Sequence, residues 1–186
     1  MLAPRDSRSR DCRRLDGLWR FRFDTGGEGE AARWWQGPLP GGREMAVPAS
    51  YNDLVTEAAE REHVGDVWYQ REVRVPATWE GRRIVLRCDA ATHHGTVWAG
   101  ETQVAEHAGG YTPFEADVTD LVRCGEPLRV TVRVGSELNM ATIPPGVMSQ
   151  STSAAGNCGT STTSSTTRGC TAPCGSTAPR GATSPI

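Results

Sequence analysis

The stretch Gly65-Asp66-Val67-Trp68-Tyr69-Gln70-Arg71-Glu72-Val73-Arg74-Val75-Pro76 decides how this 186-residue chain folds. It begins at a glycine, ends at a proline, and alternates aromatic, β-branched and polar residues in between, a period of two that predicts a β-strand. Its two faces carry Tyr69, Arg71, Val73 and Val75 on one side, and Trp68, Gln70, Glu72 and Arg74 on the other. Because both faces mix polar and apolar side chains, we expect neighbouring residues, rather than bulk water, to hold the polar groups.

Segments of the same kind lie on both sides of this stretch. Residues 15–24 alternate Trp19, Phe21 and Phe23 with charged side chains, which is typical of a half-buried strand. Further extended segments are predicted at residues 46–53, 83–89, 96–105, 109–118 and 128–134. Residues 96–105 are predicted to form a hairpin that turns at residues 99–101.

Helices contribute little to the predicted fold. Residues 31–35 are the best candidate for a short helical turn, before Gly37, Pro38 and Pro40 break it. About seven or eight short strands at regular spacing between Gly17 and Gly135 predict an all-β fold, an antiparallel β-sandwich.

Composition divides the chain into three parts. Hydrophobic residues make up 37% of the sequence, which is low for a fully folded chain, and the shortfall is concentrated at the C-terminal end. We therefore predict an N-terminal arm at residues 1–14, the sandwich at residues 15–148, and a low-complexity, disordered tail at residues 149–186 that is rich in Ser, Thr, Gly and Pro.

Charge and hydropathy exclude several classes of partner. The net charge of −2 gives no electrostatic case for binding nucleic acid or an anionic membrane surface. No apolar run is long enough to span a membrane, and residues 1–14 have no apolar core of the kind found in a secretory signal. A cytoplasmic protein is the expectation.

The cysteines and histidines do not predict a metal site. The six cysteines divide equally between the body and the tail, and no pair has the CxxC spacing of a zinc site, so free thiols are expected. His93 and His94 are adjacent, and adjacent residues on a strand point to opposite faces. They have no acidic or cysteine partner at metal-binding spacing, so no metal and no cofactor are predicted.

No catalytic residue stands out in the sequence. Glu72, Asp89, Glu115 and Asp117 are candidates for paired carboxylates, but they lie on different predicted strands and no motif singles out a pair. Nucleophile-elbow, phosphate-loop and dinucleotide fingerprints do not occur. The residues alone therefore predict a β-sandwich with no visible chemistry.

The tryptophans allow two interpretations. Trp34 and Trp35 are expected to pack into the core or an edge of the fold, because large aromatic side chains mainly supply burial. The alternative is an exposed aromatic platform for sugars, as a stand-alone carbohydrate-binding module requires, for which Trp34, Trp35 and Trp98 are the candidates.

Taken together, these segments resemble the N-terminal sugar-binding domain of the β-glucuronidases in glycoside hydrolase family 2. The resemblance follows the family's order over nearly all of residues 1–148. The matching segments are Leu15-Asp16-Gly17-Leu18-Trp19, Arg33-Trp34-Trp35, Val47-Pro48, Tyr51-Asn52-Asp53, Val67-Trp68-Tyr69-Gln70-Arg71-Glu72, Arg83-Ile84-Val85-Leu86-Arg87, His107, residues 109–118, Glu137-Leu138-Asn139 and Thr142-Ile143-Pro144-Pro145-Gly146.

The resemblance implies a jelly-roll (galactose-binding-like) sandwich, followed in whole enzymes by an immunoglobulin-like domain and a TIM barrel. Those enzymes cleave glucuronides with retention, using two glutamates of the barrel. The resemblance also implies a homo-oligomer for the intact enzyme. This chain ends before the barrel, so we expect it to be non-catalytic alone, as an enzyme fragment. The alternatives are a carbohydrate-binding module and a structural or interaction remnant.

The tail has a further interpretation, that it is the same gene read in a wrong frame. The bases can be regrouped so that each new codon starts at the last base of an original codon. Residues 160–165 can then encode Tyr-Phe-His-Asp-Phe-Phe, which resembles the family's amino-acid sequence at this point. The aspartate encoded in the shifted frame at the position of Thr163 matches an aspartate that contacts the sugar in the family. Because threonine stands there in this chain, no substrate-binding residue is predicted. The frames are expected to join between residues 146 and 156, and the loss of the next strand predicts an unpaired sheet edge.

Overall fold

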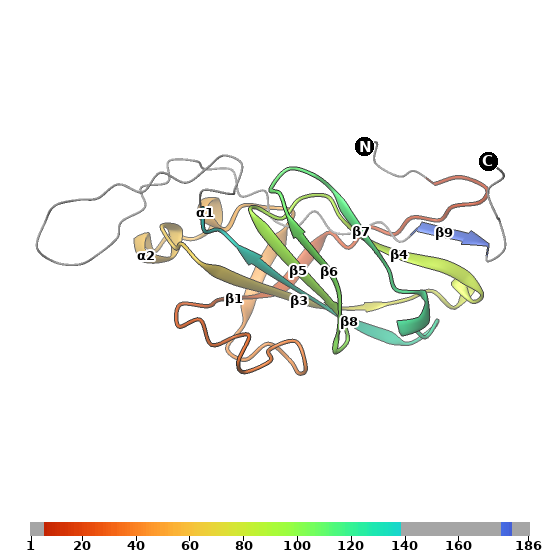
Figure 1. Ribbon diagram of the computed structural model, residues 1–186, viewed down its shortest axis with the longest axis horizontal. Helices are drawn as coiled ribbons and strands as arrows, with labels where there is room; N and C mark the ends of the chain where they lie inside the picture. The colour runs from red at the N-terminus through yellow and green to blue at the C-terminus, as the bar shows by residue number, and fades with distance from the viewer. Residues whose placement is uncertain (1–5, 139–175, 180–186) are drawn as a thin grey trace, which may run out of the picture.

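The computed structural model describes residues 6–138 and 176–179 as a mostly antiparallel β-structure with short helices (Figure 1). Its elements, in chain order, are β1 (Gly17–Phe23), β2 (Arg43–Val47), α1 (Tyr51–Leu54), α2 (Ala58–Arg61), β3 (Asp66–Arg74), η1 (Ala77–Trp79), β4 (Arg82–Cys88), β5 (His94–Ala99), β6 (Thr102–Ala108), β7 (Phe114–Asp117), η2 (Thr119–Leu121), β8 (Pro127–Gly135) and β9 (Ser176–Pro179). The predicted all-β sandwich is confirmed, and no helix among the described residues exceeds four residues.

The strands form two sheets. The larger sheet has six strands in the order β2-β1-β3-β8-β5-β6, and the smaller has three in the order β7-β4-β9. Every strand pair is antiparallel, and β5 and β6 form the predicted hairpin. The stretch that opened the sequence analysis is β3, which lies inside the larger sheet and pairs with β8 over its whole length.

The main core lies between the two sheets. Alternating valines of β8 and aromatic side chains of β1 and β3 contribute from the larger sheet, and aliphatic side chains of β4 contribute from the smaller one. The central members are Trp19, Phe21, Tyr69, Ile84, Leu86, Val97, Val130 and Val132, all at most 8% exposed. In β1 the period-two pattern supplies one of these apolar faces, whereas β4 is buried continuously from Ile84 to Cys88.

A second core lies on the outer face of the larger sheet. The segment of residues 24–42, hereafter the covering loop, is drawn in orange below β1 in Figure 1 and packs over Trp68 and Trp98. Its own Trp34 and Leu39 are buried there. Residues 31–35 form consecutive turns within this loop, with the Trp34 N–H donating to the Gly29 carbonyl. Both faces of β3 are therefore covered from Val67 to Gln70, as its mixed pattern indicated, whereas Glu72 and Arg74 are exposed.

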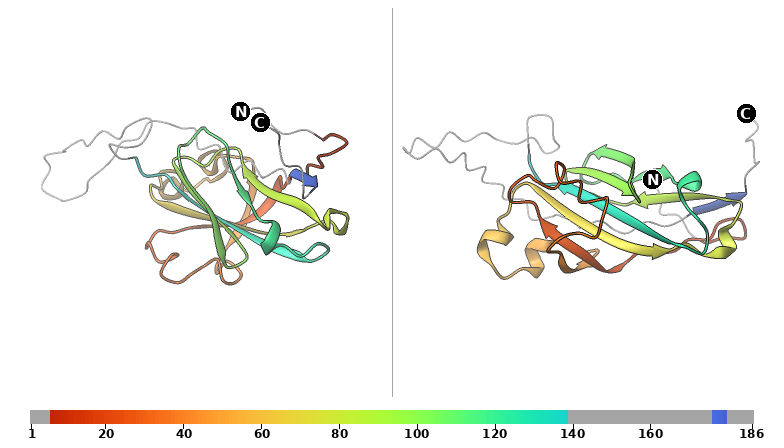
Figure 2. Two further views of the ribbon diagram at one scale, coloured as in Figure 1. Left: turned by 45° about the vertical axis from the view of Figure 1, so that its right-hand side comes forward. Right: turned by 90° about the horizontal axis from the view of Figure 1, so that it is seen from below.

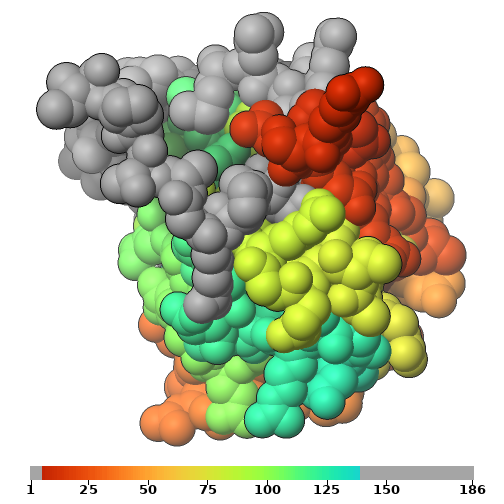
Figure 3. Space-filling model, turned by 90° about the vertical axis from the view of Figure 1, so that its right-hand side faces the viewer, coloured from red at the N-terminus to blue at the C-terminus, as the bar shows by residue number. Residues whose placement is uncertain are grey.

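The N-terminal arm packs against one end of the sandwich. Figure 3 shows residues 6–14, in red, beside the yellow-green chain around β4. The Trp79 Nε1–H donates to the Asp11 carboxylate over 2.7 Å, and the Arg13 guanidinium donates to the Arg74 carbonyl over 3.2 Å. These contacts hold the arm to the loop between β3 and β4.

The tail contributes one described strand. β9 pairs antiparallel with β4, with Arg82 opposite Pro179 and Val85 opposite Ser176, and both strands run together in the two views of Figure 2. The expected unpaired edge was therefore wrong along this part of β4, because a segment of the tail occupies it. The rest of the predicted tail, residues 149–175 and 180–186, lies outside the described residues. Among the residues that are described, no helix is long and apolar enough to cross a membrane.

Candidate functional site

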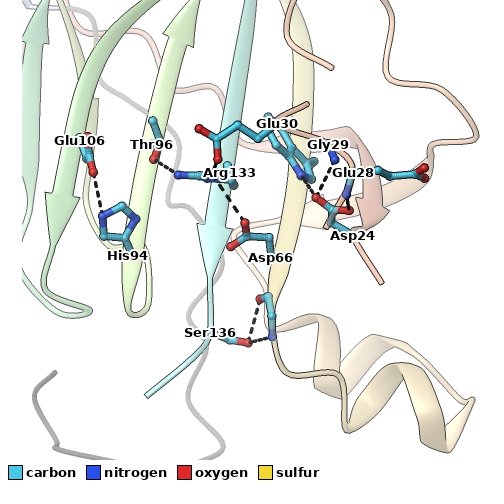
Figure 4. A network of polar contacts seen from close by, with 12 residues as sticks. Asp24, Glu28, Gly29, Glu30, Asp66, His94, Thr96, Glu106, Arg133 and Ser136 are labelled. Carbon is cyan, nitrogen blue, oxygen red and sulfur yellow. Dashed lines mark hydrogen bonds and ion pairs between the residues drawn. The ribbon is translucent and has the colours of Figure 1, made fainter. Parts of the chain in front are cut away.

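A polar network lies on the outer face of the larger sheet, centred on Arg133 of β8 (Figure 4). Its guanidinium donates to the Glu30 carboxylate over 2.7 Å and to the Thr96 hydroxyl over 3.2 Å, and it lies 3.7 Å from the Asp66 carboxylate. The same group lies 6.0 Å from the centre of the Trp68 ring. Arg133 thereby ties the covering loop to three strands, and its donors are used by the protein itself.

Asp24 anchors the beginning of the covering loop beside this network. Its carboxylate is buried and accepts hydrogen bonds from the Glu28 N–H, the Gly29 N–H and the Trp68 Nε1–H at 2.8–3.1 Å. A Cβ atom at Gly29 would lie 2.5 Å from the Trp68 Nε1 atom, so only glycine allows this approach. A buried carboxylate that accepts three hydrogen bonds is a structural anchor of the loop.

Gln70 anchors the other end of the covering loop. Its side-chain oxygen accepts from the Leu39 N–H over 2.8 Å. Its amide nitrogen donates to the Gly37 carbonyl over 2.9 Å, to the Thr131 hydroxyl over 3.1 Å and, more weakly, to the Trp34 carbonyl. The expectation that neighbours hold the polar groups of β3 is confirmed at this residue.

The tryptophan candidates for a sugar platform form a packed cluster instead. Trp34 and Trp98 are 5% and 4% exposed, and only Trp35 is half-buried. Trp35 stacks on Trp98 at 4.8 Å between ring centres, and the Arg22 guanidinium lies 3.9 Å above the Trp34 ring. The interpretation of these aromatic residues as core packing is confirmed. The alternative interpretation, an exposed platform formed by them, was wrong.

The carboxylate candidates lie in different environments. Asp89 and Glu115 come together on the smaller sheet, where each lies 2.7 Å from the buried guanidinium of Arg87. Sequence spacing did not reveal this grouping, because the pairing of β4 with β7 creates it. Glu72 is exposed on β3. Asp89 and Glu115 thus share one permanent cation, and both carboxylates are used in ion pairs within the fold.

Asp117 is also held by an arginine. A hydrogen bond from the Arg83 guanidinium and another from the Thr119 hydroxyl lower the pKa of Asp117 to about 2. The carboxylate is therefore ionised at every physiological pH and has no proton to give. Its exposed ion pair fastens the end of β7 to β4.

All four histidines lie at one end of the sandwich. This is the end where β3 and β5 begin and where β6 and β8 finish. His94 pairs with Glu106 at 3.1 Å, and His107 accepts or donates a hydrogen bond with Thr112 at 2.7 Å. Within residues 6–138 and 176–179, no group of three or more His, Cys, Asp or Glu side chains is arranged to hold a metal ion.

Among the residues that the structure describes, His93 is the buried side chain with an unsatisfied polar atom. Its Nδ1 atom is buried and has no hydrogen-bond partner within the described structure, and burial lowers the pKa of the imidazole. Its backbone joins three segments, because its N–H donates to the Gly135 carbonyl over 2.7 Å and its carbonyl accepts from the Gly109 N–H over 2.9 Å. A neutral His93 therefore lies beside Gly135, the last residue of β8.

We predict that the protein loses stability as the pH falls below about 6.5, the ordinary histidine value. His93 takes up a proton more readily in the unfolded chain, because its pKa is lowered in the folded one, so acid favours unfolding. Urea unfolding between pH 8 and pH 5 measures this slope. The variant His93→Gln should flatten it. Equal slopes for wild type and His93→Gln would contradict the assignment.

Thr163 lies outside the described residues. This is the position where the wrong-frame interpretation places an aspartate. The carboxylates of Asp24, Asp89, Glu115 and Asp117 are each held by hydrogen bonds or ion pairs of the fold.

Comparisons with known proteins give the chain its relatives. Residues 12–148 match the family described as glycosyl hydrolases family 2, sugar binding domain. The β-glucuronidase of Paenibacillus borealis is 44% identical over 146 residues, which cover 78% of this chain and 24% of that protein. The human β-glucuronidase is 41% identical over 160 residues, which cover 80% of this chain and 25% of that protein.

Solved structures agree with the sequence relatives. The Ruminococcus gnavus β-glucuronidase superposes with a TM-score of 0.76 at 36% identity, covering 81% of this chain and 25% of that one. The same enzyme has been solved in complex with D-glucuronic acid, with a TM-score of 0.75 at 36% identity over 78% of this chain and 25% of that one. This chain therefore spans about a quarter of the length of the relatives that it matches.

Proposed function

Because this chain belongs to the sugar-binding domains of glycosyl hydrolases family 2, we propose that it is the N-terminal part of a β-glucuronidase and is non-catalytic alone. The observation that carries the proposal is the match of residues 12–148 to that domain, at 36–44% identity to β-glucuronidases over about a quarter of their length. Hydrolysis by such enzymes needs two carboxyl groups facing one glycosidic bond. The grouped carboxylates described above are instead held by arginines.

The proposal predicts that the purified 186-residue chain does not hydrolyse an aryl glucuronide. The measurement is release of the aryl alcohol at pH 5 to 8, with the Paenibacillus borealis enzyme as a positive control. Activity should stay at the level of the buffer. Turnover that co-purifies with the chain and scales with its concentration would contradict the proposal.

A binding titration separates this proposal from the stand-alone carbohydrate-binding module. With Trp34 and Trp98 buried, the described surface offers no ready aromatic platform from these residues for sugar stacking. Calorimetric titration of the chain with glucuronic acid and with neutral oligosaccharides is therefore expected to give no heat beyond dilution. Saturable heat would favour the binding module.

We also propose that the gene changes frame between codons 146 and 156. The family match ends at residue 148, beside the change in composition, and the shifted reading of residues 160–165 supports this interpretation. Thr163 would then stand in place of an aspartate whose carboxylate can accept charge-assisted hydrogen bonds. Resequencing the DNA around these codons tests the proposal, and one uninterrupted frame that encodes the present protein would overturn it.

A further inference from the structure

The edge of the larger sheet at β2 has an open backbone. β2 pairs with β1 from Gly17 opposite Val47 to Phe21 opposite Arg43. It is the last strand of the sheet, and in the described part of the chain no strand pairs with its other side. An open edge presents backbone N–H and C=O groups in the spacing that another extended chain requires.

A hollow of about 290 Å³ lies against this edge. One wall is β2 itself, with Met45 and Ala46, and the other is the segment that joins α1 to α2, with Leu54 and Val55. A strand added to β2 would therefore enter a groove with two walls rather than lie on an open surface.

An exposed apolar side chain lines the groove. Leu54 is 50% exposed on the α1 side, next to Val55, and both residues line the hollow. Leu54 is one of five large hydrophobic side chains that are exposed in the described structure. It is placed to cover an apolar side chain of a strand added at β2.

The charges around the groove are unbalanced. Arg43 is already engaged, because its guanidinium donates two hydrogen bonds to the Glu60 carboxylate, at 3.0 and 2.8 Å. Glu44 and Glu57 are exposed, and neither has an ion-pair partner within residues 6–138 and 176–179. The groove therefore has one cation against three carboxylates. This surplus of negative charge favours a basic occupant and disfavours an acidic one.

We propose that the β2 edge is a docking site for an extended segment of another polypeptide in which basic and apolar side chains alternate. The backbone of the segment adds a strand to β2. Its basic side chains lie on the face of β2 that carries Glu44, while its apolar side chains lie on the opposite face, toward Leu54 and Val55 of the groove. This is strand addition, in which the backbone ladder supplies affinity and alternate side chains supply specificity. The inference is independent of the proposed enzymatic role.

A fluorescein-labelled peptide of about seven residues that alternates lysine and valine tests the proposal. Fluorescence anisotropy with the full chain, in about 50 mM NaCl, should show saturable binding of this peptide. Two further peptides should not bind: one that alternates glutamate and valine, and a lysine–valine peptide whose central valine is replaced by proline, which interrupts a strand ladder. Equal binding of the proline peptide would overturn strand addition.

A pair of matched variants separates the groove from general electrostatic attraction. The double variant E44K/E57K should weaken binding of the lysine–valine peptide by at least about tenfold. The control E101K/E126K changes the net charge equally at exposed sites away from the groove, and it should stay within about twofold of wild type. Circular dichroism verifies that each variant is folded. Equal losses in both variants, no binding to wild type, or a peptide-free dimer that only E44K/E57K dissociates would each overturn the proposed occupant.

Discussion

Replacing Trp68 by alanine is expected to lower the free energy of unfolding by about 3–5 kcal/mol, the usual cost of deleting a large buried aromatic side chain. Trp68 is fully buried, and its ring contacts Trp34, Trp35 and Trp98 at 5.3–6.1 Å between centres. It also donates to the Asp24 carboxylate that starts the covering loop. The loss thus removes packing and an anchor at once.

Two further variants separate these contributions, all measured by urea unfolding followed by circular dichroism. Trp68→Phe keeps an aromatic ring but loses the donor to Asp24, so its loss should be intermediate. Trp35→Ala, at a half-buried ring, should cost less, about 1–2 kcal/mol. If Trp35→Ala proved as destabilising as Trp68→Ala, the outer cluster would not be organised around Trp68.

Gln70→Leu should have the second-largest effect, a loss of about 2–4 kcal/mol, although leucine fills a similar volume. The substitution leaves the Leu39 N–H without its acceptor and the Gly37 carbonyl and Thr131 hydroxyl without their donor. Buried polar groups that lose a partner carry the full cost of desolvation.

The matched control lies two residues along the same strand. Glu72 is on the same face as Gln70 but is exposed, so Glu72→Leu should change the unfolding free energy by less than about 0.5 kcal/mol. The comparison uses the same denaturant titration. Similar effects of Gln70→Leu and Glu72→Leu would show that the side-chain hydrogen bonds of Gln70 contribute nothing measurable.

The strands of the sandwich were predictable because their information is local. The alternation in residues 15–24, 65–76 and 128–134 determines which side chains enter the main core, and the structure places β1, β3 and β8 there. The short helix α1 was not expected, since Tyr51 was assigned to an extended segment leading into a loop. Helix α1 is held by a hydrogen bond from the Tyr51 hydroxyl to the carbonyl of His63, which is 12 residues away in sequence.

The second core could not be predicted from local patterns. Arg22, Arg129 and Arg133 look like the solvent-facing residues of alternating strands, yet their guanidiniums bond to Pro40, Gln36 and Glu30 of the covering loop. These contacts join segments that are up to 103 residues apart in sequence. Periodicity identified two faces on β3, but it carries no information about what covers the outer one.

The same limit applies to the candidate site. Asp89 and Glu115 looked unrelated in sequence, and only the register of β4 with β7 brings them to Arg87. In the structure each of these carboxylates has an arginine partner, a grouping that no motif indicated. His93 was dismissed as a metal ligand on strand geometry, but nothing in the sequence indicated that its Nδ1 atom would be buried without a partner.

The tryptophan cluster makes the protein its own optical probe. Four of its six tryptophans lie in the outer cluster with the covering loop, while Trp19 and Trp79 belong to the core between the sheets. Rings stacked at 4.8 and 5.3 Å are close enough to exchange excitation energy, so their ultraviolet dichroism depends on this stacking. Intrinsic fluorescence and near-ultraviolet dichroism therefore report chiefly on the covering loop. Opening of that layer can be followed separately from melting of the strands, without attaching a dye.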